Sequence, residues 1–271
     1  MPGDRSLRIA IGLFFVLALA SLVGPWLRPF DAWHTDWTQL QIAPGITHGH
    51  WLGSDAIGRD VFVRTLLAGR VSLLLGFGAG AIALLFGLAY GALAGTLGGA
   101  IERLMMRALD VVSALPFLLI VVLLLTLFGR SGVLLVVAVG VYACIDLARM
   151  LRAEAARLRV LPFVQAARAL GAGPWWLLTR HIVPNLLGFA VVYLSLAIPQ
   201  AILVESFLSF LGLGLDEPSV SLGGLLAEGV QELEDAPWVL LAPGGFLAAL
   251  LIAFTLLGDA LRARLQRPGV A

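Results

Sequence analysis

Residues Val71–Gly98, VSLLLGFGAGAIALLFGLAYGALAGTLG, form a stretch without a single charged side chain. An α-helix rises about 1.5 Å per residue, so roughly 20 apolar residues cross the roughly 30 Å of hydrocarbon in a bilayer. The stretch therefore predicts a membrane-spanning helix. Its glycines Gly76, Gly80, Gly87, Gly91 and Gly95 fall on one helical stripe. Because small residues let another backbone approach closely, this stripe predicts a helix-packing face.

Further segments share this apolar character, and together with the first they predict six membrane-spanning helices. Their approximate limits are Ile9–Leu27, Val111–Phe128, Val133–Met150, Leu186–Leu211 and Trp238–Leu261. The composition agrees, because 60% of the 271 residues are hydrophobic and 13% are charged, whereas a soluble domain is about half apolar and about a quarter charged. We predict an all-α integral membrane protein with an N-terminal helix and outer segment, residues 1–70, and a core of five spanning helices, residues 71–271.

The distribution of charge predicts the side of the membrane on which each loop lies. Arginines concentrate in the segments that share a side with the N-terminus: Arg5, Arg8, Arg103, Arg107, Arg262, Arg264, Arg267 and those between residues 149 and 180. The segment before the last helix is acidic instead, with Asp216, Glu217, Glu228, Glu232, Glu234 and Asp235. Since positive residues favour the cytoplasmic side, both termini are expected there. An alternative for the first segment is a cleaved signal peptide, although its apolar run exceeds the usual ~7–15 residues of a signal core.

Rare and missing residue types exclude several kinds of chemistry. All the basic residues are arginine, so a P-loop lysine and a Schiff base are ruled out in this chain. If ATP drives this protein, another chain must bind it. The single cysteine, Cys144, excludes an internal disulfide and a multi-thiolate metal site. The formal net charge of +1 offers no global attraction to nucleic acid, and no cofactor is expected on this chain.

The polar stretch between the fourth and fifth apolar segments, Leu151–Asn185, carries the most information about function. Pro162 interrupts an amphipathic run, and a short helix is expected from Phe163 until Gly171, Gly173 and Pro174 stop it. A second helical stretch then runs from Trp175 to His181 and meets Pro184. Taken by itself, this pattern favours an ordinary cytoplasmic helical hairpin whose small residues merely pack closely.

The same stretch carries a resemblance to a known family. Gln165-Ala166-Ala167, followed by Gly171 and by His181-Ile182-Val183-Pro184, resembles the cytoplasmic loop shared by permease subunits of binding-protein-dependent ABC importers. That loop usually begins with Glu-Ala-Ala, so Gln165 departs from the family at a residue to which a salt bridge is assigned. Val183 stands where the family usually has leucine.

Further stretches resemble the C-type subunit of peptide and nickel importers and extend the resemblance over nearly the whole chain. They are 52–73, 205–214 and 257–262. Within that group, the chain looks closest to oligopeptide permeases in residues 115–117, 145–149 and 181–205. The alternative is the same subunit of a dipeptide or nickel importer. Leu222 and Val63 depart from the family, which often has Trp and Ser there.

The resemblance implies a type I ABC importer permease fold, with six transmembrane helices and a cytoplasmic coupling helix within residues 151–185. It implies a non-catalytic subunit of the bacterial inner membrane. The implied partners are a second, B-type permease, two ATPase subunits that hold ATP and Mg, and an extracytoplasmic peptide-binding protein. The residues expected to couple to the ATPase are Phe163, Gln165, Ala166, Ala167, Arg168, Leu170, Gly171 and Pro184.

Two residues of the fifth apolar segment are candidates for the translocation path or the partner interface. A carboxylate in a membrane helix is costly and faces protein or water, so Glu205 is either part of the translocation path or a gate, or a packing or hydrogen-bonding residue at the interface with the partner. Pro199 removes a helix hydrogen bond and predicts a kink, as does Pro116 in the third segment. Charged residues three apart, Arg107 with Asp110 and Asp146 with Arg149, predict local ion pairs.

Other functional classes find less support in the residues. His48 and His50 lack a fixed third ligand, which makes them a weak metal site. A secondary transporter would place ionisable residues at mid-membrane and show inverted repeats. A membrane-embedded enzyme would need paired catalytic groups at similar depth. Neither pattern is visible in the sequence.

Overall fold

The computed structural model describes residues 2–27, 32–45, 49–215 and 218–265. His48, Asp216, Glu217 and Arg267 lie outside the described residues, as do the side chains of Arg5 and Arg264. Every regular element in the described ranges is a helix, which confirms the predicted all-α class.

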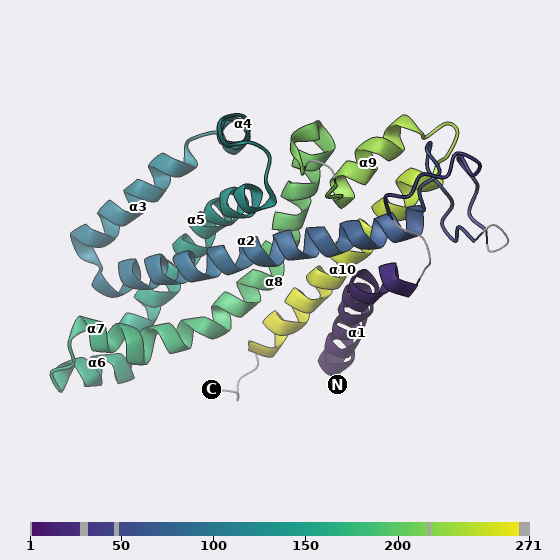
Figure 1. Cartoon of the computed structure of the whole chain (residues 1–271). Coiled ribbons are helices and arrows are strands. Elements are labelled where there is room, and N and C mark those ends of the chain that lie inside the picture. Colours follow the sequence, from purple (N-terminus) through teal and green to yellow (C-terminus); the bar gives the residue numbers. More distant parts are fainter. Residues whose placement is uncertain (1, 28–31, 46–48, 216–217, 266–271) are drawn as a thin grey trace.

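Five long helices form the body of the molecule (Figure 1). They are α1 Pro2–Val23, α2 Val61–Leu97, α5 Gly132–Arg159, α8 Val183–Leu208 and α10 Trp238–Leu265. Short helical turns extend some of them: η1 Gly24–Leu27 follows α1, α7 Pro174–Leu177 and η2 Leu178–Ile182 precede α8, and η3 Ser209–Leu213 follows it. The remaining helices are α3 Gly99–Ser113, α4 Phe117–Phe128, α6 Pro162–Ala169 and α9 Leu222–Gln231. Five of these continuous helical segments are long and apolar enough to cross a membrane.

The third predicted segment is not one helix. α3 ends at Ser113, α4 begins at Phe117, and the two are bent by 72°. Pro116 lacks the N–H that would continue the helix, and it disfavours the helical conformation at the preceding Leu115. The bent pair makes a sixth span if it crosses as one unit. Pro199, by contrast, lies inside the unbroken helix α8.

Helix α2 begins ten residues before the predicted Val71, because Asp60 caps it. The Asp60 side chain accepts a hydrogen bond from the Val63 amide at 2.8 Å. Arg64 and Arg70, which interrupt the apolar pattern, lie within the helix. The predicted division between residues 70 and 71 thus falls inside α2.

The glycine stripe of α2 is a packing face, as predicted. A Cβ atom at Gly76 would lie 2.5 Å from Cγ1 of Ile202 on α8. At Gly91 and Gly95 it would lie 2.5 Å from the carbonyl oxygens of Ala148 and Arg152 on α5. The stripe therefore lets α2 pack against α8 along one half of its length and against α5 along the other.

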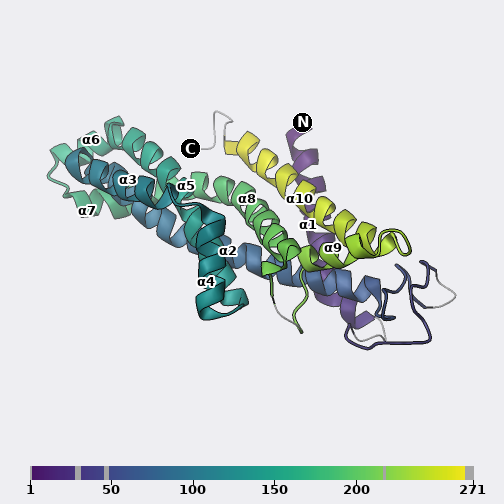
Figure 2. The same ribbon diagram turned by 90° about the horizontal axis from the view of Figure 1, so that it is seen from above.

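The first helix is part of the same bundle. The ring of Phe14 on α1 lies 4.9 Å from that of Phe254 on α10 and 6.2 Å from that of Phe77 on α2. Figures 1 and 2 place the N-terminal end of α1 and the C-terminal end of α10 away from residues 32–45, residues 49–60 and α9. The α6–α7 hairpin projects at the end of the molecule farthest from that outer segment.

Candidate coupling hairpin and outer ion-pair cluster

The hairpin between α5 and α8 folds where the sequence predicts it. Pro162 stands at the start of α6, where a missing N–H costs nothing. Gly171 has a φ of 93°, a left-handed conformation that favours glycine, and it reverses the chain after α6. The Gln165 side chain donates from Nε2 to the Arg159 carbonyl oxygen at 2.8 Å. Gln165 thus caps the end of α5 and joins it to α6.

One face of the hairpin is anchored in the bundle. Val164, Leu177 and Ile182 are buried in one hydrophobic cluster with Leu147 and Leu151 of α5. A displacement of α6 therefore has to move α5 and α8 with it, because close-packed interiors transmit strain.

The other face of the hairpin is apolar and exposed. Phe163 is 43% exposed, Leu170 is 90% exposed, and Trp175 and Trp176 are exposed beside them. Gln165, Ala166, Arg168 and Gly171 are also exposed, whereas Ala167 is half-buried. The His181 ring lies 5.8 Å from that of Phe163 and 4.9 Å from that of Trp176, so it connects the two arms. Exposed apolar residues clustered on one projection mark an interaction surface.

Pro184 does not end the second arm. The turn η2 is a π-helix in which the Val183 amide donates to the carbonyl of Leu178, and Pro184 then lies at the start of α8. In a π-helical turn each amide bonds to the carbonyl five residues earlier, so the hydrogen-bond pattern shifts by one residue. The helix therefore continues through the exposed Pro184 without a break. The arm and the membrane helix are one continuous segment, Pro174–Leu213.

Glu205 lies in a polar cluster near the C-terminal end of α8. It is 2% exposed and accepts hydrogen bonds from Ser72 of α2 at 3.1 Å and from Ser209 at 2.7 Å. Ser72 also accepts from the Leu222 amide at the start of α9, at 3.5 Å. Hydroxyl donors offset the cost of burying a carboxylate. Glu205 therefore joins α2, α8 and α9, and Pro199 is buried on the same helix.

A buried ion-pair cluster joins the outer segment to α9. The Arg64 guanidinium donates to Asp55 Oδ2 at 2.7 Å and to both Glu228 oxygens at 2.7 and 3.1 Å. Arg59 also pairs with Asp55, at 2.6 Å, and with Glu228, at 3.0 Å. The side chains of Asp55 and Arg64 are 1% and 3% exposed. We call these four residues the outer cluster.

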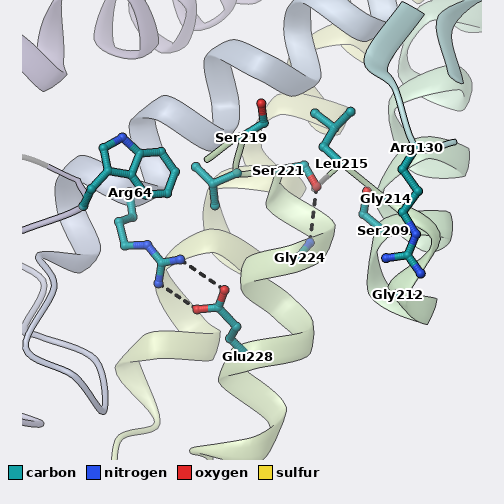
Figure 3. A pocket seen from close by; sticks show the side chains of 12 residues that line it. Arg64, Arg130, Ser209, Gly212, Gly214, Leu215, Ser219, Ser221, Gly224 and Glu228 are labelled. Carbon is teal, nitrogen blue, oxygen red and sulfur yellow. Dashed lines mark hydrogen bonds and ion pairs between the residues drawn. The ribbon is translucent and has the colours of Figure 1, made fainter. Parts of the chain in front are cut away.

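Arg64 and Glu228 of the outer cluster line a cavity of about 130 Å³ (Figure 3). Figure 3 shows the Arg64 guanidinium facing the Glu228 carboxylate, with Ser221 nearby and Arg130 farther along the cavity. Glu232 lies close by, and burial, assisted by the negative charge of Asp55, raises the pKa of its carboxyl above the ordinary 4.5.

The comparisons with known proteins match this chain along most of its length. The family model described as "Binding-protein-dependent transport system inner membrane component" matches residues 87–267, more than half of the chain. The chain belongs to this family of inner membrane transport components.

Curated relatives cover still more of this permease. It is 45% identical over 258 residues to the oligopeptide transport system permease protein OppC of Escherichia coli (strain K12), covering 94% of this chain and 85% of that protein. It is 35% identical over 261 residues to OppC of Bacillus subtilis (strain 168), covering 95% and 85%. It is 36% identical over 254 residues to the dipeptide transport system permease protein DppC of the same organism, covering 93% and 79%.

The structure also shows which interactions of this permease the sequence did not predict. The Nδ1 atom of His50 forms a hydrogen bond with the Asp60 carboxylate at 2.7 Å, in the buried cap of α2. Within the described residues, no group of three ligands could hold a metal ion. Arg149 lies 3.7 Å from Asp146, as predicted, but it is closer to Asp110 of α3, at 3.0 Å. The outer cluster was also missed. Its first and last residues, Asp55 and Glu228, are 173 positions apart in the sequence. Spacing along the sequence gives no signal for a contact between segments so far apart.

Proposed function

We propose that this chain is the permease subunit of an ATP-driven importer that moves oligopeptides across the bacterial inner membrane. It forms half of the pathway, and a related B-type permease forms the other half. The observation that carries the proposal is the α6–α7 hairpin with its exposed apolar face, found in a chain that resembles oligopeptide permeases over more than nine-tenths of its length. The family of inner membrane components supports the placement in that membrane.

The hairpin is the point where ATP-driven motion enters this subunit. Two ATPase partners hold ATP and Mg, and one of them contacts Phe163, Gln165, Ala166, Ala167, Arg168, Leu170, Gly171 and Pro184. Their closure displaces α6, and the buried contacts of Val164 and Ile182 carry the displacement into α5 and α8. Since the second arm is continuous with α8, movement of the arm tilts a membrane helix.

The opposite end of the subunit receives the peptide. An extracytoplasmic binding protein delivers it to the side formed by residues 32–60 and α9. Glu205 stands at this end of the path, where it couples α9 to α2 and α8, and Pro199 lies deeper in the same helix. Both termini are cytoplasmic in this orientation, which places the arginine-rich segments inside.

Reconstitution of the complete importer tests this function. The tagged chain is isolated in mild detergent, its partners are identified, and ATPase activity is measured with and without peptide-loaded binding protein. We expect a second permease and two ATPases, with hydrolysis stimulated by the loaded binding protein. If only dipeptide or nickel stimulates hydrolysis, the importer architecture stands and the substrate assignment changes from oligopeptides to that ligand. The similarity to a dipeptide permease allows this outcome. A chain that purifies alone and transports alone would overturn the importer.

Two neighbouring glycines provide a matched test of the coupling hairpin. Gly171 has a φ of 93° and Gly173 a φ of −72°, and a Cβ at either would meet no atom within 4 Å. Because valine is strained only at positive φ, Gly171→Val should distort the turn after α6, whereas Gly173→Val should not. We expect peptide-stimulated ATP hydrolysis to fall at least about tenfold in the first variant only. Equal activity of the two variants would contradict the role of this turn in coupling.

A further inference from the structure

Polar side chains form a line on the facing sides of α5 and α8, in the part of the subunit that crosses the membrane. Tyr142 and Asp146 are four residues apart on α5, and Tyr193 and Gln200 are seven apart on α8. Since these spacings keep residues on one helical face, each pair forms a stripe. All four line a single small cavity, together with Phe117 of α4. We call this feature the α5–α8 groove.

The groove lies at the depth of the hydrocarbon. Asp146 is 14 residues from the start of α5 at Gly132, and Gln200 is 13 residues from the end of η3 at Leu213. At about 1.5 Å per residue, both lie about 20 Å from the outer ends of their helices, within a hydrocarbon layer of about 30 Å.

A carboxylate at this depth needs water, a partner or a ligand. The Asp146 side chain is 58% exposed, and Tyr142 and Gln200 are exposed as well. Other exposed positions along the same parts of the two helices are apolar, including Val133, Val137, Leu187 and Leu203. Because polar groups in lipid are costly, the polar face is the one turned to a water-filled path, and the apolar faces suit lipid or protein packing.

The charges around the groove neutralise the Asp146 carboxylate only in part. Its nearest cation, the Arg149 guanidinium, lies 3.7 Å away. The same guanidinium lies 3.0 Å from Asp110 and donates to Ser113 at 2.7 Å. Two carboxylates therefore share one arginine, which is closer to the one outside the groove.

These groups suit one class of ligand, given the importer function proposed above. A glutamine amide and two phenol hydroxyls can each donate and accept, so they can bind peptide N–H and C=O groups whatever the side chains. A carboxylate adds a partner for a free ammonium group. We propose that Tyr142, Asp146, Tyr193 and Gln200 bind the main chain and the free amino terminus of the peptide as it passes through the subunit.

Uptake by the complete importer in proteoliposomes tests the groove. The peptide is a radiolabelled oligopeptide with a free amino terminus, supplied on its binding protein. Asp146→Asn keeps the size of the side chain and removes its charge. Asp259→Asn is the control, because it makes the same change at an exposed carboxylate of α10 that does not line the cavity. We expect uptake to fall at least about tenfold in Asp146→Asn and to change by less than about twofold in Asp259→Asn. Recovery of the assembled complex checks that each variant folds.

A second measurement locates the peptide directly. A peptide with a photoreactive diazirine on its amino-terminal residue is irradiated during turnover, and the labelled residues are identified by mass spectrometry. Labelling of 142–146 or 193–200 is expected, and labelling of other spans alone would overturn the groove. Equal uptake defects in Asp146→Asn and Asp259→Asn, or none in either, would overturn it too. The proposed function fails separately, and this inference with it, if the wild-type complex takes up no peptide.

Discussion

At the scale of single residues, Gln165 shows how one side-chain atom changes a junction. Its Nε2 donates to the Arg159 carbonyl at the end of α5. An ionised glutamate, the residue usual in the family, has no proton to donate and would place negative charge at the negative end of a helix. The hydrogen bond found here is therefore available to glutamine and not to the ionised family residue.

Gln165→Glu should loosen the junction of α5 and α6. Loss of one hydrogen bond is worth about 1 kcal/mol, so amide exchange near Val160–Val164 should accelerate roughly fivefold. Hydrogen–deuterium exchange with mass spectrometry measures this directly. Gln165→Met is the control for lost bonding without added charge and should show a smaller acceleration. Unchanged amide exchange in Gln165→Glu would contradict the role of Gln165 as a cap of α5.

Glu232 is a second single residue whose surroundings predict a measurable effect. Burial and the charge of Asp55 raise the pKa of its carboxyl above 4.5. The folded state therefore favours the protonated form, and stability is lost as the pH rises from the ordinary pKa through the raised one. Glu232→Gln should be more stable than wild type near pH 8 and lose that advantage near about pH 4. Thermal unfolding across that range tests it, with the exposed Glu234→Gln as the control that should show no such trend.

At the scale of helices, the contact of α2 with α5 depends on glycine. A Cβ at Gly91 would lie 2.5 Å from the Ala148 carbonyl oxygen and 3.0 Å from the Arg152 amide. Gly91→Leu should force the helices apart and cost about 1–3 kcal/mol, the usual range for overpacking. The midpoint of thermal unfolding in detergent reports this loss. Gly245→Leu on α10, where no atom lies within 4 Å, is the matched control, and equal midpoints would contradict the packing role.

At the scale of the whole molecule, the outer cluster joins a segment near the N-terminus to a helix near the C-terminus. Arg64→Leu leaves Asp55, which is 1% exposed, with Arg59 alone. Removing one partner of a buried ion pair typically costs about 3–5 kcal/mol. We expect a lower unfolding midpoint and faster proteolysis of residues 49–60. Arg70→Leu, six residues further along α2, should have a smaller effect, and equal effects of the two would show that the cluster does not secure the segment.

The sequence by itself determined the class of protein and most of its elements. Apolar runs long enough to span a bilayer, prolines and glycines at the hairpin, and the glycine stripe are local signals, and local steric and solvation rules interpret them. Prolines and glycines around Gln165 and Gly171 predicted the hairpin itself, whereas its proposed coupling role came only from the resemblance to ABC importer permeases. The start of α2 and the bend at Pro116 were harder to predict from the sequence. An arginine reads as a solvent-exposed residue even where it is buried in a helix, and a proline can either kink a helix or end it.

Only the tertiary structure decided which residues meet. Glu205 with Ser72, Arg64 with Glu228 and Arg149 with Asp110 are separated by 133, 164 and 39 positions, and no periodicity links them. The groove of Tyr142, Asp146, Tyr193 and Gln200 likewise exists because α5 and α8 pack with these faces together. Periodicity shows which face of a helix is polar, but the choice of the neighbouring helix depends on packing of the whole bundle, and that choice creates the site.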